Sequence, residues 1–154
     1  MKKTIIILIG IIILIVAFVF IFMLNKDSKF YLDDNNYNTE ERFIEIDGKE
    51  LNKLMNDKKS FVVFTYLPYC TFSVPCDVVF ETFLNNNNMS FYKIPFDKLS
   101  KLKKFENIKY APSIIIIKNG KIITYLDANS DDDLEMYQNT NTFSDWITKY
   151  IKLK

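Results

Sequence analysis

The sequence predicts an α/β domain, built on a central mixed sheet flanked by helices, with an N-terminal transmembrane helix. Two observations carry this prediction. Residues 5–24 form an unbroken apolar run without a charged or polar side chain. From residue 42 onward, strand-like segments alternate with segments of helical spacing in the order βαβαβαββα, and no internal repeat is visible. The domains expected are therefore an anchor over residues 1–24, a polar linker over 25–41 and an α/β domain over 42–154.

The apolar run has the length of a membrane span. Twenty helical residues at about 1.5 Å each reach roughly 30 Å, the thickness of the hydrocarbon layer. A cleavable signal peptide would be shorter and would close on a small-x-small site, whereas this run ends Phe-Ile-Phe-Met-Leu. We therefore predict an uncleaved signal anchor that contacts membrane lipid through residues 5–24.

The lysines that flank this run predict its orientation. Lys2 and Lys3 precede it, while the two lysines that follow are diluted by Asp27. Positive charge is retained in the cytoplasm, so the domain is expected on the extracytoplasmic side of the cell membrane, as a single-pass protein. That side permits disulfide bonds.

Composition excludes several classes of function. Once Lys2 and Lys3 are set aside, the 20 basic residues fall to 18, against 19 acidic ones, so nucleic acid is not expected as a partner. The chain has no histidine, which excludes Ser-His-Asp and Cys-His catalysis and histidine zinc sites. Two cysteines cannot complete a structural zinc site, and neither metal nor cofactor is expected.

The first half of the domain is predicted from four segments. Residues 42–47 alternate apolar and polar side chains like a short strand, and Asp47 with Glu50 forms a capping box for the helix that follows. Residues 60–67 are continuously apolar, β-branched or aromatic, which is typical of a strand covered on both faces. Residues 76–84 have helical spacing and end at a run of four asparagines.

The second half adds two strands that form a hairpin. Residues 90–96 predict a strand, and a short basic helix follows from Asp97. Residues 112–117 are a second fully apolar strand, joined by an Asn-Gly turn to an antiparallel partner. The last helix is expected from about residue 142 or 144 to residue 152. Helix-separated strands predict parallel pairing in the first half.

Both cysteines lie in the segment "PYCTFSVPC", six positions apart. On one continuous helix Cys70 and Cys76 would lie about 9 Å apart along the axis, too far for a disulfide. If Ser73 is the N-cap and Pro75 lies in the first turn, residues 70–72 can fold back and let the two thiols meet. A thiol in a first helical turn gains thiolate character from the helix dipole and the free N–H groups.

The element order, the cysteine between a buried strand and a helix, and "YAPSIIIIKNGK" downstream resemble the thioredoxin superfamily over residues 42–154. Within this superfamily, the chain resembles membrane-anchored thioredoxin-like proteins of Gram-positive bacteria, including the bacteriocin transport accessory proteins. The resemblance implies a thioredoxin-like fold and a cis-proline at Pro112, which shapes the substrate groove beside the reactive thiol. It places Cys70 near the nucleophilic cysteine and Ser73 near the resolving one, although Pro75-Cys76 also resembles the Pro-Cys end of the family motif.

The chain departs from the family pattern at two further places. Tyr69 stands where the family has tryptophan, and the strand over residues 61–64 lacks the usual buried acid. Three interpretations stay open: a thiol-disulfide oxidoreductase in which Cys70 attacks and Cys76 resolves, a non-catalytic binding module with a structural Cys70–Cys76 disulfide, and a monothiol site at Cys70. The first would act on thiol- or disulfide-bearing secreted or membrane proteins.

Two charged segments are given structural interpretations. The lysines between residues 98 and 104 are expected on the solvated face of a short helix. Residues 127–135 hold five carboxylates but lack the ligand spacing and the glycine of a calcium loop, so a surface loop is expected.

Overall fold

A computed structural model describes residues 15, 29–67 and 76–154 of the chain. Its centre is a five-stranded sheet in the order β1-β3-β2-β4-β5. The strands are β1 Phe43–Glu45, β2 Phe61–Tyr66, β3 Phe91–Pro95, β4 Ser113–Lys118 and β5 Lys121–Tyr125. β3 pairs in parallel with both β1 and β2, while β4 is antiparallel to β2 and to β5. The mixed sheet and the predicted element order are confirmed.

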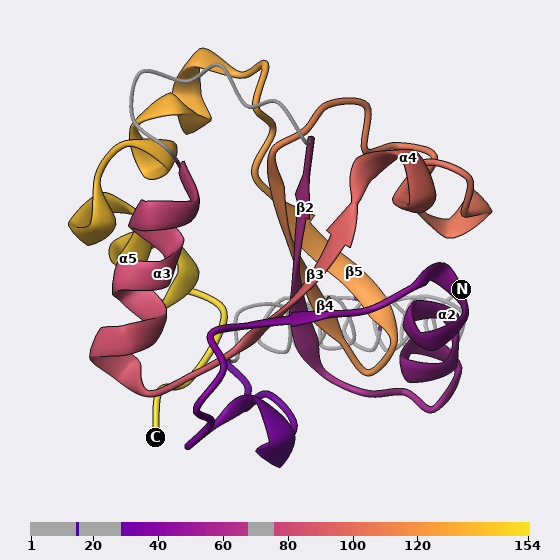
Figure 1. Cartoon of the computed structure of the whole chain (residues 1–154), viewed down its shortest axis with the longest axis horizontal. Helices are drawn as coiled ribbons and strands as arrows, with labels where there is room; N and C mark the ends of the chain where they lie inside the picture. Colours follow the sequence, from indigo (N-terminus) through magenta and orange to yellow (C-terminus); the bar gives the residue numbers. More distant parts are fainter. Residues whose placement is uncertain (1–14, 16–28, 68–75) are drawn as a thin grey trace, which may run out of the picture.

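Helices cover both faces of this sheet (Figure 1). α3 (Cys76–Asn87) and α5 (Thr140–Ile147) lie together on one face, and α2 (Gly48–Asn56) and α4 (Phe96–Leu99) belong to the other. Three short 3-10 helices complete the described elements: η1 (Asp34–Asn36), η2 (Lys103–Phe105) and η3 (Asp131–Tyr137).

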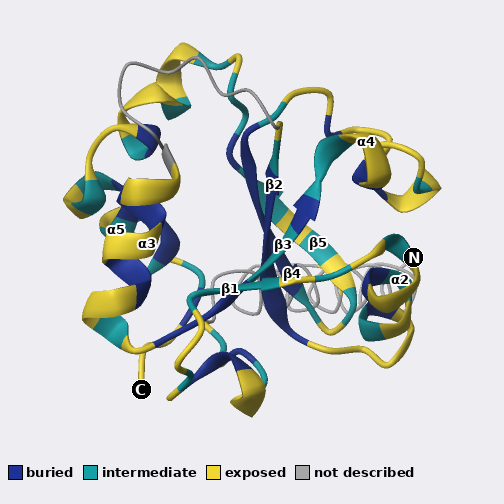
Figure 2. Ribbon diagram, in the orientation of Figure 1, coloured by how far each residue is buried: buried dark blue, intermediate teal, exposed yellow. Residues whose placement is uncertain are grey.

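The buried residues form two clusters, one on each face of the sheet (Figure 2). The cluster under α3 and α5 is rich in phenylalanine: the rings of Phe80 and Phe143 lie 4.7 Å apart, and those of Phe83 and Phe143 lie 5.2 Å apart, edge to face. Such aromatic pairs contribute about 0.5–1.5 kcal/mol each beyond the area that they bury. The continuous apolar runs of β2 and β4 follow from this arrangement, because both of their faces are covered.

Local signals placed the start of α2 and the hairpin turn correctly. The Asp47 carboxylate accepts hydrogen bonds from the N–H groups of Lys49 and Glu50, and the Glu50 carboxylate accepts one from the N–H of Asp47. This is the predicted capping box. The predicted hairpin turn is also present, with Asn119 at φ 51° and Gly120 at φ 72°, the left-handed pair that a tight antiparallel hairpin needs.

The ends of two other helices differ from the prediction. α3 continues through the asparagine run to Asn87 and stops where Asn88 takes a left-handed conformation with φ 50°. The buried Phe83 and Leu84 hold this turn in place, so the weak helix propensity of asparagine is overridden. α5 begins at Thr140, earlier than expected, because the side chain of Asn139 caps the first turn.

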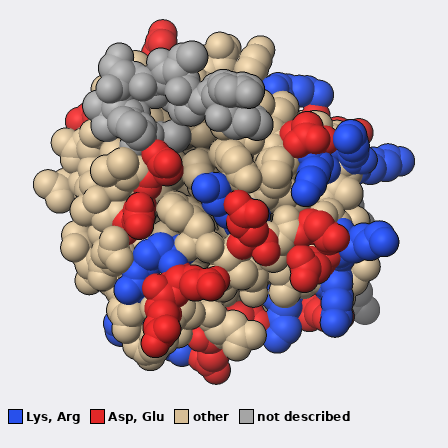
Figure 3. Space-filling model, viewed as in Figure 1, with Lys and Arg blue, Asp and Glu red and all other residues tan. Residues whose placement is uncertain are grey.

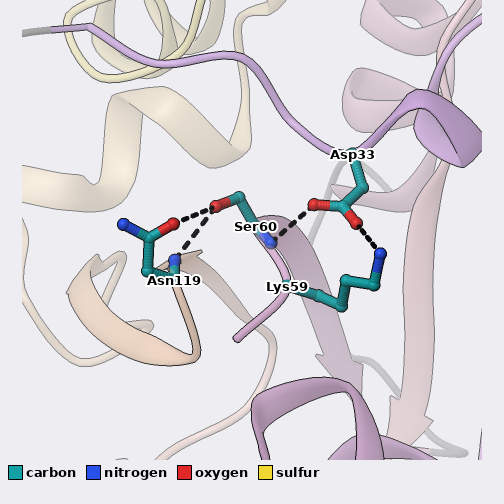
Figure 4. Close-up of polar contacts among 4 residues, drawn as sticks. All are labelled: Asp33, Lys59, Ser60 and Asn119. Carbon is teal, nitrogen blue, oxygen red and sulfur yellow. Dashed lines mark hydrogen bonds and ion pairs between the residues drawn. The ribbon is translucent and has the colours of Figure 1, made fainter. Parts of the chain in front are cut away.

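The segment expected to be a polar linker packs onto the domain, which corrects the predicted domain boundary. Residues 30–37, called here the clasp, include Leu32 and Tyr37, which are 3% and 6% exposed. Asp33 accepts a hydrogen bond from the N–H of Ser60 at 2.9 Å and pairs with Lys59 at 2.7 Å (Figure 4). The clasp has no sustained apolar period, so periodicity alone placed the start of the domain too late, at residue 42.

Of the two charged segments interpreted from sequence, the acidic one contains a short helix that was not expected. Residues 131–137, part of the expected surface loop and its continuation, form η3, and Tyr137 is 1% exposed. The four lysines between residues 98 and 104 are exposed, as expected. Acidic and basic side chains are intermixed on the face drawn in Figure 3.

The predicted membrane anchor falls outside the described residues except for Ile15. Within the part of the chain that the structure describes, no helix is long and apolar enough to cross a membrane.

Candidate thiol site

The cysteine segment connects the end of β2 to the start of α3. β2 ends at Tyr66, and Cys76 is the first residue of α3. Cys70 and Ser73 lie outside the described residues, so their predicted roles stay predictions, and so does a Cys70–Cys76 bond.

Pro112 lies at the same end of the sheet as the cysteine segment. The peptide bond between Ala111 and Pro112 is cis, and Pro112 is buried. Ser113, which follows it, is the partner of Thr65 near the end of β2. Because β2 and β4 are antiparallel, the first residue of β4 meets the last residues of β2.

A buried tyrosine joins Pro112 to the first turns of α3. The hydroxyl of Tyr137 donates a hydrogen bond to the Pro112 carbonyl oxygen at 2.9 Å. Its ring packs edge to face on Phe80 of α3, with centroids 5.8 Å apart, and Phe80 packs on Phe64 of β2 at 5.4 Å. Strand, helix start and cis-proline are therefore held together by one continuous contact chain. Sequence reasoning missed Tyr137, because a single tyrosine in an acidic segment carries no periodic signal.

The strand that leads to the cysteines provides no carboxylate. Residues 61–64 are apolar and at most 2% exposed, and Phe64 faces the same core cluster as Phe80. Thr65, which follows, is fully buried, and its hydroxyl has no hydrogen-bond partner among the described residues. The buried acid of the family pattern is thus absent from this strand, and a proton acceptor for a thiol must come from elsewhere.

A lysine stands over aromatic rings at this end of the sheet. Lys93 Nζ lies 4.4 Å from the ring centroid of Tyr66, 5.4 Å from Phe43 and 5.8 Å from Phe64. Cation–π attraction of this kind contributes about 0.5–2 kcal/mol per favourable contact. The sequence analysis did not single out Lys93. The one signal that could have found it is a lysine within a strand whose neighbours are otherwise buried.

Tyr66 has a perturbed environment of its own. Burial raises the pKa of its hydroxyl, and the negative charge of Glu45 raises the pKa further. The Tyr66 hydroxyl donates to Glu45 Oε1 at 3.3 Å. A neutral phenol is therefore maintained at neutral pH, beside the lysine and before the cysteine segment.

The electrostatics of the helix start act in two directions. In general, the free N–H groups and the dipole at a helix start favour an anionic side chain. Asp77, which is exposed, adds a negative charge one residue later, and its carboxylate accepts a hydrogen bond from the N–H of Val78 at 3.1 Å. A neighbouring carboxylate disfavours a thiolate, so the two effects oppose each other.

In the described ranges, no group of three or more Cys, Asp or Glu residues is arranged to hold a metal ion.

Comparisons with known proteins identify the fold. The family model described as thioredoxin matches residues 42–140. No curated protein matches the sequence. Among solved structures, a mutant thioredoxin of Halobacterium salinarum NRC-1 is similar, with TM-score 0.51 and 19% identity over 73% of this chain and 94% of that one. Thioredoxin O1 of Arabidopsis thaliana, in the oxidised state, has TM-score 0.51 and 14% identity over 73% and 100%. Thioredoxin of Malassezia sympodialis has TM-score 0.50 and 17% identity over 73% and 96%. At these identities the structures show the fold.

Proposed function

The chain belongs to the thioredoxin family, and from that premise we propose that it is a membrane-anchored, extracytoplasmic protein that exchanges thiols and disulfides through Cys70 and Cys76. Membership in the family supports redox function in general. The proposal adds the cysteine pair, the anchor over residues 5–24 and protein substrates outside the membrane.

One observation carries the proposal. α3 begins at Cys76 at the same end of the sheet as the cis bond before Pro112, and Tyr137 connects the two. A thiol at a helix start gains thiolate character, and a thiolate is the nucleophile of disulfide exchange. A peptide that lies along Pro112 would present its disulfide to this helix start.

The exchange reaction balances as two displacements. The Cys70 thiolate attacks one sulfur of a substrate disulfide, which forms a mixed disulfide and releases the other substrate sulfur as a thiolate that takes up a proton. The Cys76 thiolate then attacks the Cys70 sulfur, forms the Cys70–Cys76 bond and expels the second substrate thiolate. Two electrons pass from the protein to the substrate. The reverse sequence oxidises a substrate dithiol.

A second function is favoured by the apolar strand. Phe64 and its neighbours in β2 provide no carboxylate to accept a proton from a resolving thiol. Without such a group, a Cys70–Cys76 disulfide could instead brace a binding module that uses the Pro112 end of the sheet for protein contacts and turns nothing over. The reduction potential separates the two functions, because structural disulfides lie below about −300 mV and exchangeable ones above.

The test equilibrates the protein with dithiol and disulfide buffers of known potential, and counts alkylated thiols by mass spectrometry. The proposal expects a potential above the structural range and reduction by small dithiols under native conditions. It also expects Cys76→Ser to accumulate a mixed disulfide with substrate proteins. Cys70→Ser should accumulate none, and Ser73→Ala should behave as the parent. A bond that resists millimolar dithiol would support the binding module instead.

The location in the proposal is tested independently. The apolar run over residues 5–24 and the two lysines before it support an anchor with the domain outside. An impermeant maleimide added to intact cells should label the reduced cysteines. Labelling only after lysis would place the domain in the cytoplasm and contradict this part of the proposal. The resemblance to accessory proteins of Gram-positive bacteria is a finer hypothesis within it.

A further inference from the structure

The clasp fastens the domain at the end of the sheet opposite the cysteine segment. Asp33 bonds to Ser60, directly before β2, in both directions: its N–H donates to the Ser60 carbonyl at 2.8 Å and its carboxylate accepts from the Ser60 N–H. Asn36 bonds to Ser90, directly before β3. β2 and β3 are parallel, so their first residues lie at one end of the sheet, and Leu67 follows β2 at the other.

The chain termini of the domain meet at this same end. Phe30 donates a backbone hydrogen bond to the Tyr150 carbonyl at 3.0 Å and accepts one from the Lys152 N–H at 2.7 Å. The Tyr37 hydroxyl accepts from the Leu32 N–H at 3.0 Å and donates to the Lys152 carbonyl at 2.8 Å. Figure 1 shows the clasp and the C-terminus together at the end of the domain away from η3.

The length of the sheet separates the two ends. From Ser60 to Leu67 the chain rises seven residues, which at about 3.3 Å each is roughly 23 Å. The cis bond before Pro112 lies at the Leu67 end, because Thr65 and Ser113 are partners. Any redox chemistry at the start of α3 therefore takes place about 23 Å from the point where the clasp holds the chain.

Few residues connect the proposed anchor to the clasp. Six steps lead from Leu24, the last residue of the apolar run, to Phe30, the first clasp residue with a backbone bond. Fully extended, six steps span at most about 20 Å. A flexible chain of this length has an end-to-end distance nearer ~14 Å. The headgroup layer occupies roughly 5–7 Å of that reach.

We propose that the clasp holds the domain with its cysteine end away from the bilayer, so that the site acts on thiols or disulfides that stand clear of the membrane surface. This inference rests on the proposed function and names its substrate class. For the cysteine end to point down at the headgroups, the clasp would have to rise about 23 Å from the membrane, beyond what the tether allows. Cysteines next to a membrane span are excluded as substrates. Secreted proteins and the outer parts of membrane proteins are accessible.

The test uses the full chain in lipid vesicles, with Cys70→Ser and Cys76→Ser so that redox activity plays no part. Two single-cysteine variants of this protein are labelled. One has Val78→Cys, an exposed position in the first turn of α3, and the other has Lys121→Cys, beside the hairpin at the clasp end. Energy transfer to a headgroup-labelled acceptor lipid should be several-fold stronger from residue 121. Equal transfer from both probes, or transfer from neither, overturns the inference.

A tether insertion is the matched control. About twelve Gly/Ser residues placed between Lys26 and Asp27 leave the clasp intact and raise the end-to-end distance of the tether from ~14 Å to ~24 Å. Transfer from residue 78 should then rise toward that from residue 121. If it does not rise, the short tether is not what holds the domain, and the inference fails.

A substrate competition completes the test with Cys70 and Cys76 restored. One reporter disulfide is carried on a soluble peptide and the other is fixed close to a lipid headgroup. The protein should reduce the soluble reporter and spare the headgroup reporter until the tether is lengthened. Reduction of both reporters at the parent tether length overturns the inference. Reduction of neither, with the energy-transfer difference preserved, overturns the proposed function and leaves the orientation standing.

Discussion

Removing the hydroxyl of Tyr137 should weaken the domain at the point where Pro112 is positioned. In Tyr137→Phe the ring keeps its contact with Phe80, but the 2.9 Å hydrogen bond to the Pro112 carbonyl is lost. Tyr137 is 1% exposed, so water does not readily replace the missing donor. A buried acceptor left without its donor costs about 1–3 kcal/mol. For a domain of this size, a loss of about 2 kcal/mol lowers Tm by roughly 6–12 °C.

The measurement is urea unfolding of residues 29–154, followed by far-UV circular dichroism and compared with Tyr150→Phe. Tyr150 is only half-buried, its ring packs against Trp146, and its hydroxyl makes no hydrogen bond among the described residues. The control should therefore remain within about 0.5 kcal/mol of the parent. If both variants lose equal stability, the reasoning from the Pro112 bond is refuted. The dependence on urea should keep its slope, because the same surface is exposed on unfolding.

Three further predictions test the fold, the first with a control variant. Gly120→Ala should cost at least about 2 kcal/mol in a thermal melt, because the φ of 72° disfavours a side chain and the new Cβ would lie 2.0 Å from the Met55 carbonyl oxygen. The control is Gly48→Ala, where a Cβ would make only ordinary contacts; it should be neutral or stabilising in the same melt. Leu32→Ala should cost about 2–4 kcal/mol in urea unfolding if the clasp is part of the core, and a surface-like effect would restore the linker interpretation. Asp47→Ala should lose helix-cap stability at pH 7, because the hydrogen bond from the Glu50 N–H lowers the pKa of the Asp47 carboxyl. The stability that Asp47 contributes is present above its unfolded pKa and is lost as pH falls through its folded pKa, so the difference between variant and parent should shrink in acid; a pH-independent difference contradicts this.

Several features of this protein could be predicted from sequence because they depend on residues close together in the chain. Asp47 and Glu50 are three positions apart and close a capping box wherever that helix begins. Asn119 and Gly120 allow a tight hairpin through their own backbone preferences. The continuous apolar runs of β2 and β4 indicated burial on both faces. For the same reason the position of Cys76 at a helix start was predictable from the segments on either side.

The arrangement around the candidate site depends on contacts between distant residues. Tyr137 donates to Pro112 from 25 positions away, and Lys93 reaches Phe43 from a neighbouring strand. Neither contact leaves a local pattern in the sequence. The site could therefore be outlined from the cysteines and Pro112, but the residues that surround Pro112 could not.

The clasp shows most clearly what the sequence by itself determined and what tertiary structure decided. Its residues are mostly polar and lack a helix or strand period, so the sequence alone indicated a tether between anchor and domain. Leu32 and Tyr37 become buried only because the starts of β2 and β3 and the C-terminus come together, and the Tyr37 hydroxyl bonds to Lys152 across 115 positions. Local propensities determine which segments are strands, helices and turns. Burial at the meeting point of distant segments determines where the domain begins and which of its ends is held.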